Sequence, residues 1–272
     1  MNESTPQMRS VHELMRLDGR VALITGGAGH IGSTIADAFA ELGADIAVLD
    51  RNAEGAQAVA AGLCRTRGVR AVALGIDLAD PAATQAAPAR VCAELGGLDI
   101  LVNCAAFVGT TGLTGWACGF DRQSAETWRQ AMEVNLTAVF ELVQAAHEPL
   151  ARRGGSIVNV SSIYGMAGQR PQLYAGTDYL TPAAYAASKG GLLQLTRYLA
   201  TVLAPDIRVN AITPGGIWRN QSETFRQRYE GMTPLRRMGH EEDLKGAAVF
   251  LAGSLSDYVT GQNIVVDGGW TL

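Results

Sequence analysis

The feature that most constrains the fold is an alternation along the chain between short apolar runs and longer segments of helical character. Short runs rich in β-branched residues that alternate with helical stretches are typical of β–α–β units and a parallel sheet. Several runs are apolar throughout, as expected of strands buried on both faces. The strand candidates are residues 21–25, 45–50, 70–77, 98–103, 156–161, 207–213 and 263–267.

Helical character fills the intervals between these runs. The helix candidates are residues 33–42, 54–67, 82–95, 124–150 with a break near Asn135, 182–204 and 240–253. No proline-rich, glycine/serine-rich or charged linker divides the chain, and no internal repeat is visible. We therefore expect a single doubly wound α/β domain over residues 18–272, preceded by a loose or surface-lying extension over residues 1–17.

Composition and charge argue against several classes of protein. A net charge of −4 leaves no broad basic surface for nucleic acid or an anionic membrane. The four cysteines are widely spaced with no CxxC pair, so neither a metal site nor a disulfide framework is expected, and reduced thiols fit a cytoplasmic protein. Residues 1–17 lack the apolar core of a secretory signal, and no stretch of about 18 apolar residues predicts a membrane span.

A glycine-rich loop, TGGAGHIG at residues 25–32, follows the first strand candidate and opens a helix candidate. Such a turn presents free backbone N–H groups and a helix dipole to phosphates. Gly26, Gly29 and Gly32 are spaced for this role, whereas His30 stands where the commoner spacing has glycine. Plain turn chemistry is the alternative. We interpret His30 as a variation within a working nucleotide site, with a passive imidazole favoured over one that contacts the pyrophosphate.

Asp50 ends the second strand candidate, 18 residues beyond Gly32. An acidic side chain there accepts hydrogen bonds from the adenosine ribose hydroxyls and repels a 2′-phosphate, which favours NAD over NADP. The adjacent Arg51 works against that preference, because an arginine there is able to accommodate the phosphate. A strand-end turn residue or a helix cap is the plainer interpretation of Asp50.

Tyr185 and Lys189, in the stretch AAYAASKGG, lie four residues apart on a helix candidate, so both side chains project from one face. A phenol has a reference pKa of about 10, and a nearby ammonium favours its ionised form. The pair suits general acid–base chemistry on an alcohol or ketone. Because the chain holds 20 arginines and only two lysines, a lysine at this spacing indicates a need for its compact ammonium. A surface-exposed helical pair is the alternative.

Together with these motifs, a series of ordered segments resembles the short-chain dehydrogenase/reductase family in its single-domain branch. The segments are IDL at 76–78, NCAA at 103–106, VNL at 134–136, IVNVSS at 157–162, RVNAITPGGI at 208–217 and TGQNIVVDGGW at 260–270, and the resemblance extends from about residue 18 to 272. It implies a three-layer doubly wound Rossmann fold with a mostly seven-stranded parallel sheet.

The resemblance also implies a role for each member of a catalytic set. Tyr185 would exchange a proton with the substrate oxygen while the nicotinamide exchanges the hydride. Lys189 would lower the tyrosine pKa and bind the nicotinamide ribose. Ser162 would hydrogen-bond the reacting oxygen, and Asn135 would hold a water that connects Lys189 to solvent. Plain structural roles are the alternatives: a strand end for Ser162 and a helix kink for Asn135.

The same matching implies a set of cofactor-binding residues along the strand ends. Asp77 and Leu78 would border the adenine, although Asp77 is alternatively a helix cap. The full set is Gly26, Gly29, His30, Ile31, Gly32, Asp50, Arg51, Asp77, Leu78, Asn103, Ala105, Tyr185, Lys189, Pro214, Gly215 and Ile217.

The chain departs from the family pattern at three places. Ala106 replaces a glycine of the family's NNAG motif, and Arg219 replaces a threonine that normally helps to hold the carboxamide. The interval of 23 residues from Ser162 to Tyr185 is longer than the family commonly shows. We expect this insertion to overhang the mouth of the active site.

Residues 216–239 occupy the place of the family's mobile substrate lid, which excludes water on closure. Five arginines make the segment locally basic, namely Arg219, Arg226, Arg228, Arg236 and Arg237. We therefore expect a small polar substrate that is sugar-like or anionic, such as a sugar phosphate or nucleotide sugar. A solvated helix face in an arginine-rich chain is the alternative.

The sequence thus predicts an NAD(H)-dependent oxidoreductase that interconverts a secondary alcohol and a ketone. Two alternatives stay open: an enzyme of the same fold that retains NAD and catalyses epimerisation or dehydration, and a catalytically silent NAD-binding regulator. The helix candidate over 182–204 and the segment 136–147 are apolar on more than one face, so part of their surface is expected to pack against a partner. The resemblance implies that this partner is another copy, in a tetramer.

Overall fold

One parallel sheet of seven strands forms the centre of the molecule, in the order β3-β2-β1-β4-β5-β6-β7. The computed structural model describes residues 8–107, 113–177 and 179–272. The sheet confirms the predicted doubly wound α/β fold. Its strands are β1 (Val21–Thr25), β2 (Asp45–Asp50), β3 (Ala71–Gly75), β4 (Ile100–Asn103), β5 (Ser156–Val160), β6 (Arg208–Pro214) and β7 (Asn263–Val266).

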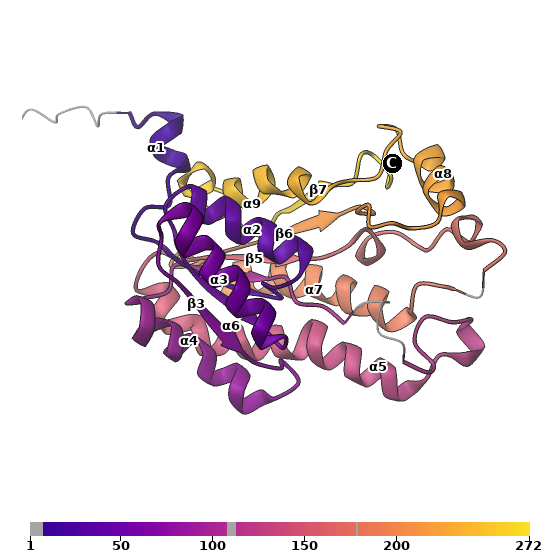
Figure 1. Ribbon diagram of the computed structural model, residues 1–272, viewed down its shortest axis with the longest axis horizontal. Helices are drawn as coiled ribbons and strands as arrows, with labels where there is room; N and C mark the ends of the chain where they lie inside the picture. Colours follow the sequence, from indigo (N-terminus) through magenta and orange to yellow (C-terminus); the bar gives the residue numbers. More distant parts are fainter. Residues whose placement is uncertain (1–7, 108–112, 178) are drawn as a thin grey trace, which may run out of the picture.

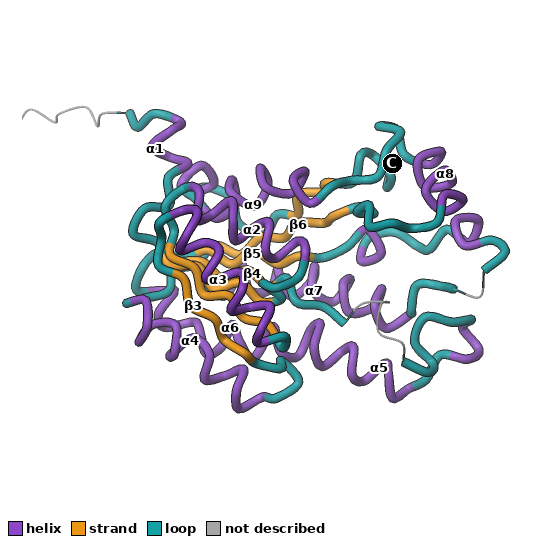
Figure 2. Tube along the Cα trace, viewed as in Figure 1, coloured by secondary structure: helices purple, strands orange, loops and turns teal. Residues whose placement is uncertain are grey.

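Helices cover both faces of the sheet and complete three layers (Figures 1 and 2). Alternate residues of a strand point to opposite faces, so Leu23 of β1 packs with one set of helices and Ile24 with the other. The first set is α4 (Pro81–Leu95), α6 (Ala138–Ala151) and α7 (Ala183–Val202). The second is α2 (His30–Glu41), α3 (Ala53–Arg67) and α9 (Lys245–Ala252).

Local signals explain where several of these helices begin and end. The Asn52 side chain accepts a hydrogen bond from Gly55 N at the start of α3, and Asp80 caps α4 in the same way. Gly68 and Gly96, both left-handed, end these two helices. The predicted helix over 124–150 is α5 (Ala125–Met132) continued by a π-helical turn, η2 (Glu133–Thr137), into α6. The expected break at Asn135 is therefore a π-bulge in a continuous helix.

Several short elements lie in segments for which the sequence predicted no regular structure. The helix α1 (Val11–Met15) packs against η6 (Ser254–Ser256), and Leu17 just beyond it is buried in the core. Two 3₁₀ turns, η3 (Ile163–Gly165) and η4 (Pro171–Tyr174), form part of the insertion before α7. The helix α8 (Glu223–Met232) lies in the predicted lid and packs against η4. Among the described residues, no helix is both long and apolar enough to cross a membrane.

The carboxyl ends of the strands meet along one edge of the sheet. From β1 the chain adds β2 and β3 on one side of the sheet, and it then adds β4 on the other side of β1. The order of strand addition therefore reverses between β1 and β4. In open α/β sheets, ligands bind outside the carboxyl ends at such a switch point. The glycine-rich loop and Ser162 follow β1 and β5 at this edge, so the fold brings the predicted nucleotide loop and catalytic serine to the same end of the sheet.

Candidate active site

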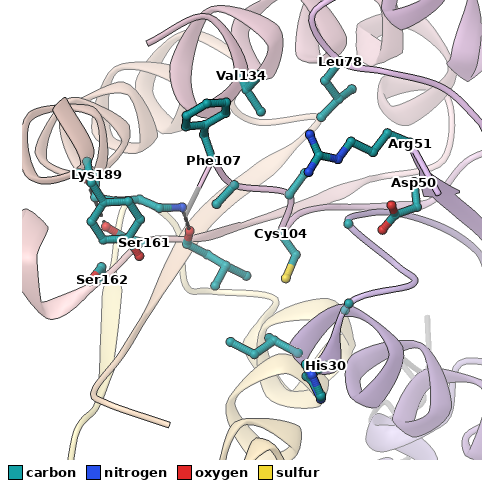
Figure 3. A pocket seen from close by; sticks show the side chains of 18 of the residues that line it. His30, Asp50, Arg51, Leu78, Cys104, Phe107, Val134, Ser161, Ser162 and Lys189 are labelled. Carbon is teal, nitrogen blue, oxygen red and sulfur yellow. Dashed lines mark hydrogen bonds between the residues drawn. The ribbon is translucent and has the colours of Figure 1, made fainter. Parts of the chain in front are cut away.

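A cavity of about 1040 Å³, called the large cavity below, lies at this edge of the sheet. Figure 3 shows His30, Asp50 and Arg51 on one side of it, Ser161, Ser162 and Lys189 on the other, and Cys104 between. Most of the residues predicted from sequence line it, namely Gly26, Gly29, His30, Ile31, Gly32, Asp50, Arg51, Asp77, Leu78, Ala105, Ser162, Tyr185, Lys189, Pro214, Gly215 and Ile217.

The glycine-rich loop can make its tight turn only because residues 26 and 32 are glycines. A Cβ on Gly32 would lie 2.2 Å from the Gly26 carbonyl oxygen, and one on Gly26 would lie 2.8 Å from Ala105 Cα. Gly26 also has a left-handed φ of +65°. Helix α2 begins at this loop with no side-chain cap, so its first N–H groups open toward the cavity. The loop therefore fits the diphosphate of a nucleotide cofactor.

Asp50 ties the end of β2 to the glycine-rich loop. One carboxylate oxygen accepts a hydrogen bond from Ala28 N at 3.1 Å, and the other accepts from Asn52 N at 2.9 Å. The plainer interpretation of Asp50 as a turn residue is thus part of its role, although the residue also lines the cavity. The neighbouring Arg51 side chain extends into the cavity toward Leu78 (Figure 3).

Lys189 projects from α7 into the opposite end of the large cavity. Its side chain is 2% exposed, and Nζ donates a hydrogen bond to the Val160 carbonyl at 2.7 Å. Burial lowers the pKa of Lys189 to about 8. The ammonium lies 5.9 Å from the centre of the Tyr185 ring, one turn earlier on the helix. The expected pairing of these two side chains on one face is therefore present.

The pKa of Tyr185 is raised, because burial disfavours the phenolate. A hydrogen bond with Ser162 lowers the pKa of Tyr185 and so opposes the effect of burial. The positive charge of Arg219 also lowers it, by a smaller amount. Burial is the larger effect on this pKa, and Lys189 Nζ is held at the Val160 carbonyl. The expectation that Lys189 lowers the pKa of Tyr185 stays a prediction.

Two predicted residues, Asn135 and Asn103, do not line the cavity but connect the elements that do. Asn135 Oδ1 accepts from Phe107 N at 2.6 Å, and Nδ2 donates to Ser188 Oγ at 3.0 Å, which joins the chain after β4 to α7. Asn103 Nδ2 donates to Asn159 Oδ1 at 2.8 Å between β4 and β5. The water-holding role of Asn135 stays a prediction.

Several lining residues were missed by the sequence reasoning. Phe107 and four residues around the end of α5, which are Arg129, Gln130, Glu133 and Val134, line the large cavity. Only Val134 falls in a quoted motif, VNL, and none of the five was assigned a site role. Cys104 also lines it, and burial raises the pKa of this thiol to about 11, so it stays protonated at neutral pH. The Thr25 hydroxyl accepts from Cys104 N and Ala105 N, both at 3.1 Å, and so joins β1 to the chain after β4.

Arg219 and His30, which both stand where the commoner motifs have another residue, meet at one carboxylate. Arg219 Nε donates to Glu241 Oε1 at 3.2 Å, and His30 Nδ1 lies 3.9 Å from the same oxygen. Both His30 and Arg219 line the large cavity. The His30 side chain is 70% exposed, so the imidazole lies at the rim of the glycine-rich loop.

A second cavity, about 220 Å³ and called the small cavity below, adjoins Tyr185 and Ser162. The insertion contributes Tyr164, Tyr174, Tyr179, Thr181 and Pro182 to its wall. The predicted lid contributes Gly216, Gln221, Phe225, Tyr229 and Met238. Tyr179 and Gln221 line both cavities, so the insertion and the lid enclose space that is continuous with the catalytic residues.

The arginines of the lid are engaged by the protein. Arg219 bonds Glu241, and Arg237 forms an ion pair with Asp243 at 2.6 Å. Arg226 pairs with two glutamates of its own helix, Arg228 donates to the Ala175 carbonyl at 2.6 Å, and Arg236 donates to the Gly231 carbonyl. The basic composition of this segment is thus largely used within the fold.

Comparison with known proteins identifies the class. A family model described as enoyl-(acyl carrier protein) reductase matches residues 26–271. A solved short-chain type dehydrogenase/reductase from Mycobacterium marinum is 33% identical, with a TM-score of 0.85 over 97% of this chain and 99% of the other. The chain therefore belongs to the short-chain dehydrogenase/reductase family and is an oxidoreductase that acts on CH–OH groups.

Individual relatives act on different compounds. D-threitol dehydrogenase of Mycolicibacterium smegmatis is 36% identical over 98% of both chains. A 3-oxoacyl-[acyl-carrier-protein] reductase of Aquifex aeolicus is 33% identical over 94% of this chain and 98% of its own. A gluconate 5-dehydrogenase from Burkholderia cenocepacia, solved with NADP and tartrate, is 34% identical, with a TM-score of 0.85 over 96% of this chain and 99% of the other.

Proposed function

We propose that the protein interconverts a secondary alcohol and a ketone of a small polyhydroxylated compound, with Tyr185 as the general acid–base and NAD(H) as the cofactor. The observation that carries the proposal is that Tyr185, Ser162 and Lys189 line the same cavity as the glycine-rich loop. A candidate proton-transfer group that shares one space with a candidate diphosphate site supports this function.

The chemistry is divided between the bound cofactor and the side chains. In the oxidising direction the substrate CH–OH loses a hydride and a proton, and a bound nicotinamide supplies the hydride acceptor. The Ser162 hydroxyl holds the substrate oxygen by a hydrogen bond. Tyr185 accepts the hydroxyl proton as the carbonyl forms, and in the reducing direction it returns a proton to that oxygen.

Lys189 provides the positive charge that assists this proton transfer. With a pKa of about 8, the ammonium is charged at neutral pH, and a cation near the phenol favours its ionised form. Because burial raises the pKa of Tyr185, the tyrosine depends on such assistance more than an exposed phenol does. Loss of the Lys189 charge above about pH 8 is therefore expected to reduce oxidation.

We propose NAD rather than NADP as the preferred cofactor. The Asp50 carboxylate lines the cavity at the end of β2, where it would repel a 2′-phosphate. Its bonds to two backbone N–H groups keep this charge in place. Arg51 works against this preference, because an arginine there is able to accommodate the 2′-phosphate. The relatives differ in the cofactor with which they were solved: the gluconate 5-dehydrogenase with NADP and a xylitol dehydrogenase with NAD⁺.

A polyhydroxylated substrate is supported by the hydroxyl-rich small cavity and by the relatives. Those named for threitol, galactitol, gluconate and xylitol all act on compounds with several hydroxyl groups. The oxoacyl reductases among the relatives represent the contrasting substrate class.

The test is a panel of polyols, sugars, sugar acids and acyl thioesters, assayed with NAD(H) and NADP(H) in parallel and with Tyr185→Phe as the blank. We expect NAD-linked turnover of polyols and a loss of about 10³-fold in kcat for Tyr185→Phe. Equal turnover by the Tyr185→Phe variant would remove the acid–base assignment. Turnover confined to acyl thioesters would remove the substrate class, and a preference for NADP would reverse the cofactor assignment.

We also propose a homo-oligomer in the cytoplasm. Large apolar side chains are exposed on α6 and α7, where Phe140 is 43%, Tyr198 59% and Val202 50% exposed. Exposed apolar side chains on these two helices favour contact with a partner, and the family resemblance suggests a tetramer. Light scattering of the purified protein tests this proposal, and a monomer at micromolar concentration would contradict it.

A further inference from the structure

The small cavity has a wall of neutral hydroxyl groups. None of the described residues that line it carries a charge. Its polar lining consists of phenols, the hydroxyls of Ser162 and Thr181, and the amide of Gln221. Gln221 is occupied by the backbone, because Oε1 accepts from Arg219 N at 2.7 Å and Nε2 donates to the Ile217 carbonyl at 2.9 Å. The phenols and the hydroxyls of Ser162 and Thr181 are therefore the side-chain groups that can meet a ligand.

Three of these hydroxyls form a chain inside the insertion. Tyr164 Oη lies 2.6 Å from Tyr174 Oη, which lies 3.0 Å from Thr181 Oγ1. Tyr174 and Thr181 are only 7% and 9% exposed. A hydroxyl has one proton and two lone pairs, so the two bonds within the chain leave lone pairs unused. The chain can accept a hydrogen bond from a ligand hydroxyl and donate its remaining proton in return.

The cavity also resists a negative charge. Burial raises the pKa of Tyr164, Tyr174 and Tyr179, and it raises that of Tyr229 to about 12, so these phenols stay neutral at physiological pH. A carboxylate or phosphate accepts hydrogen bonds but has no proton to return to the chain. Transfer of such an anion from water into a site without a cation carries a large desolvation cost.

Arginines near the small cavity do not offset that cost, because other groups hold them. Arg170 lies 4.2 Å above the Trp270 ring and donates to the Trp270 carbonyl. Arg226 forms ion pairs with Glu223 at 2.7 Å and Glu230 at 3.0 Å. Arg228 donates to the Ala175 carbonyl. The electrostatics thus favour the polyhydroxylated substrate over the anionic one, both of which the sequence had predicted.

We propose that the small cavity binds a non-reacting hydroxyl of an uncharged polyol or ketose through the chain Tyr164–Tyr174–Thr181, and that this site discriminates against sugar acids and sugar phosphates. The proposal rests on the proposed function, since it adds a specificity site to the alcohol and ketone chemistry at Tyr185. The insertion that lengthens the interval before Tyr185 supplies all three members of the chain.

The first test compares ligands that share a carbon skeleton. D-threitol, xylitol and galactitol are assayed with NAD⁺ beside threonate, xylonate and galactonate, in which a carboxylate replaces a terminal hydroxymethyl group. We expect kcat/KM for the best polyol to exceed that of its matched acid by about 100-fold or more. Equal values, or a preference for the acid, would overturn the neutral subsite.

The second test removes the central hydroxyl and keeps the ring. In Tyr174→Phe the ring contacts with Tyr179 and Phe225 can persist, at the 5.3 and 5.7 Å that now separate the ring centres. We expect kcat/KM for the polyol to fall about tenfold relative to 2-butanol, which lacks a distal hydroxyl, mainly through KM. Tyr258→Phe is the matched control, because Tyr258 is fully exposed and lies outside both cavities. An unchanged ratio in Tyr174→Phe would contradict the proposal.

The third test places a cation at the boundary of the two cavities. Gln221→Arg is expected to narrow the preference for the polyol over the matched acid by about tenfold, with melting temperature as the check on folding. An unchanged preference in this folded variant would count against the electrostatic explanation. If neither 2-butanol nor any polyol gives NADH, the proposed function fails. If alcohols are oxidised but Tyr174→Phe affects polyol and 2-butanol alike, only the subsite fails.

Discussion

The two adjoining cavities are built by different means. The floor of the large cavity consists of backbone and strand ends: a glycine-rich loop, the first turn of α2 and the residues that follow β2, β4, β5 and β6. The small cavity is enclosed by side chains of two segments far apart in sequence, one before α7 and one around α8. The first arrangement suits the nicotinamide cofactor that we propose, and the second is free to vary with the substrate.

The conformation of the glycine-rich loop should therefore depend on its glycines, which carry no side chain. In Gly32→Ala the new Cβ would stand 2.2 Å from the Gly26 carbonyl oxygen, so the loop must move. We expect the free energy of unfolding to fall by about 2–3 kcal/mol and NAD⁺ affinity to fall at least about tenfold. Denaturant titration and calorimetry measure the two effects.

The matched control is Gly62→Ala on α3, where a Cβ would meet nothing within 4 Å. Alanine in a helix interior is more stable than glycine, so this variant should gain about 0.5–1 kcal/mol and bind NAD⁺ normally. Similar losses in the two variants would mean that the loop has no special steric role.

Burial of the Lys189 ammonium in the large cavity lowers the stability of the fold. Its pKa is about 8 in the folded protein and near 10.5 when unfolded, so below pH 8 the folded protein holds an unfavourably buried charge. Lys189→Met should abolish turnover yet raise the free energy of unfolding by about 2 kcal/mol at pH 7, after the lost hydrogen bond to Val160 is allowed for.

The pH dependence follows from linkage. Between about pH 8 and 10.5 the unfolded chain retains the Lys189 proton and the folded one has lost it, so the wild type gains stability as pH rises through this window. The advantage of Lys189→Met should therefore be full below pH 8 and vanish by about pH 10.5. Denaturant titrations of both proteins across this range measure it, and a constant difference would show that Lys189 is not buried as a cation.

Substitutions at the rim of the large cavity, where Glu241 meets Arg219 and His30, should have the smallest effect on cofactor binding. Glu241 bonds Arg219 and approaches His30, but these side chains are partly exposed, and such ion pairs contribute little. Glu241→Gln should change the NAD⁺ dissociation constant by less than about threefold. A change of tenfold or more would indicate that this carboxylate orders the glycine-rich loop.

The same contrast explains how much could be predicted from sequence. The bounds of β1 and β2 and the common face of Tyr185 and Lys189 follow from local periodicity, which one segment encodes. The fold then brings together the strand ends on which the glycine-rich loop and Ser162 lie. These parts of the site were accessible without a structure.

Contacts between distant segments were not accessible in this way. No local pattern pairs Tyr164 with Tyr174 and Thr181, or brings His30 and Arg219 to Glu241, because these contacts arise only when the loops pack. The raised pKa of Tyr185 could not be predicted from sequence for the same reason. A spacing of four residues indicates the neighbouring charge of Lys189 but not how deeply the phenol is buried. Likewise, the basic composition of the lid indicates an anionic substrate, whereas in the fold its arginines bond carboxylates and carbonyls of the protein.

The central claim is that Tyr185 transfers the proton within the cofactor cavity, and a single-turnover measurement tests it most directly. Wild type and Tyr185→Phe are each saturated with NAD⁺, mixed with the best polyol of the panel, and followed by NADH absorbance. We expect rapid NADH formation by the wild type and a rate about 10³-fold slower in Tyr185→Phe, with NAD⁺ affinity retained. Equal rates in the two proteins would contradict it.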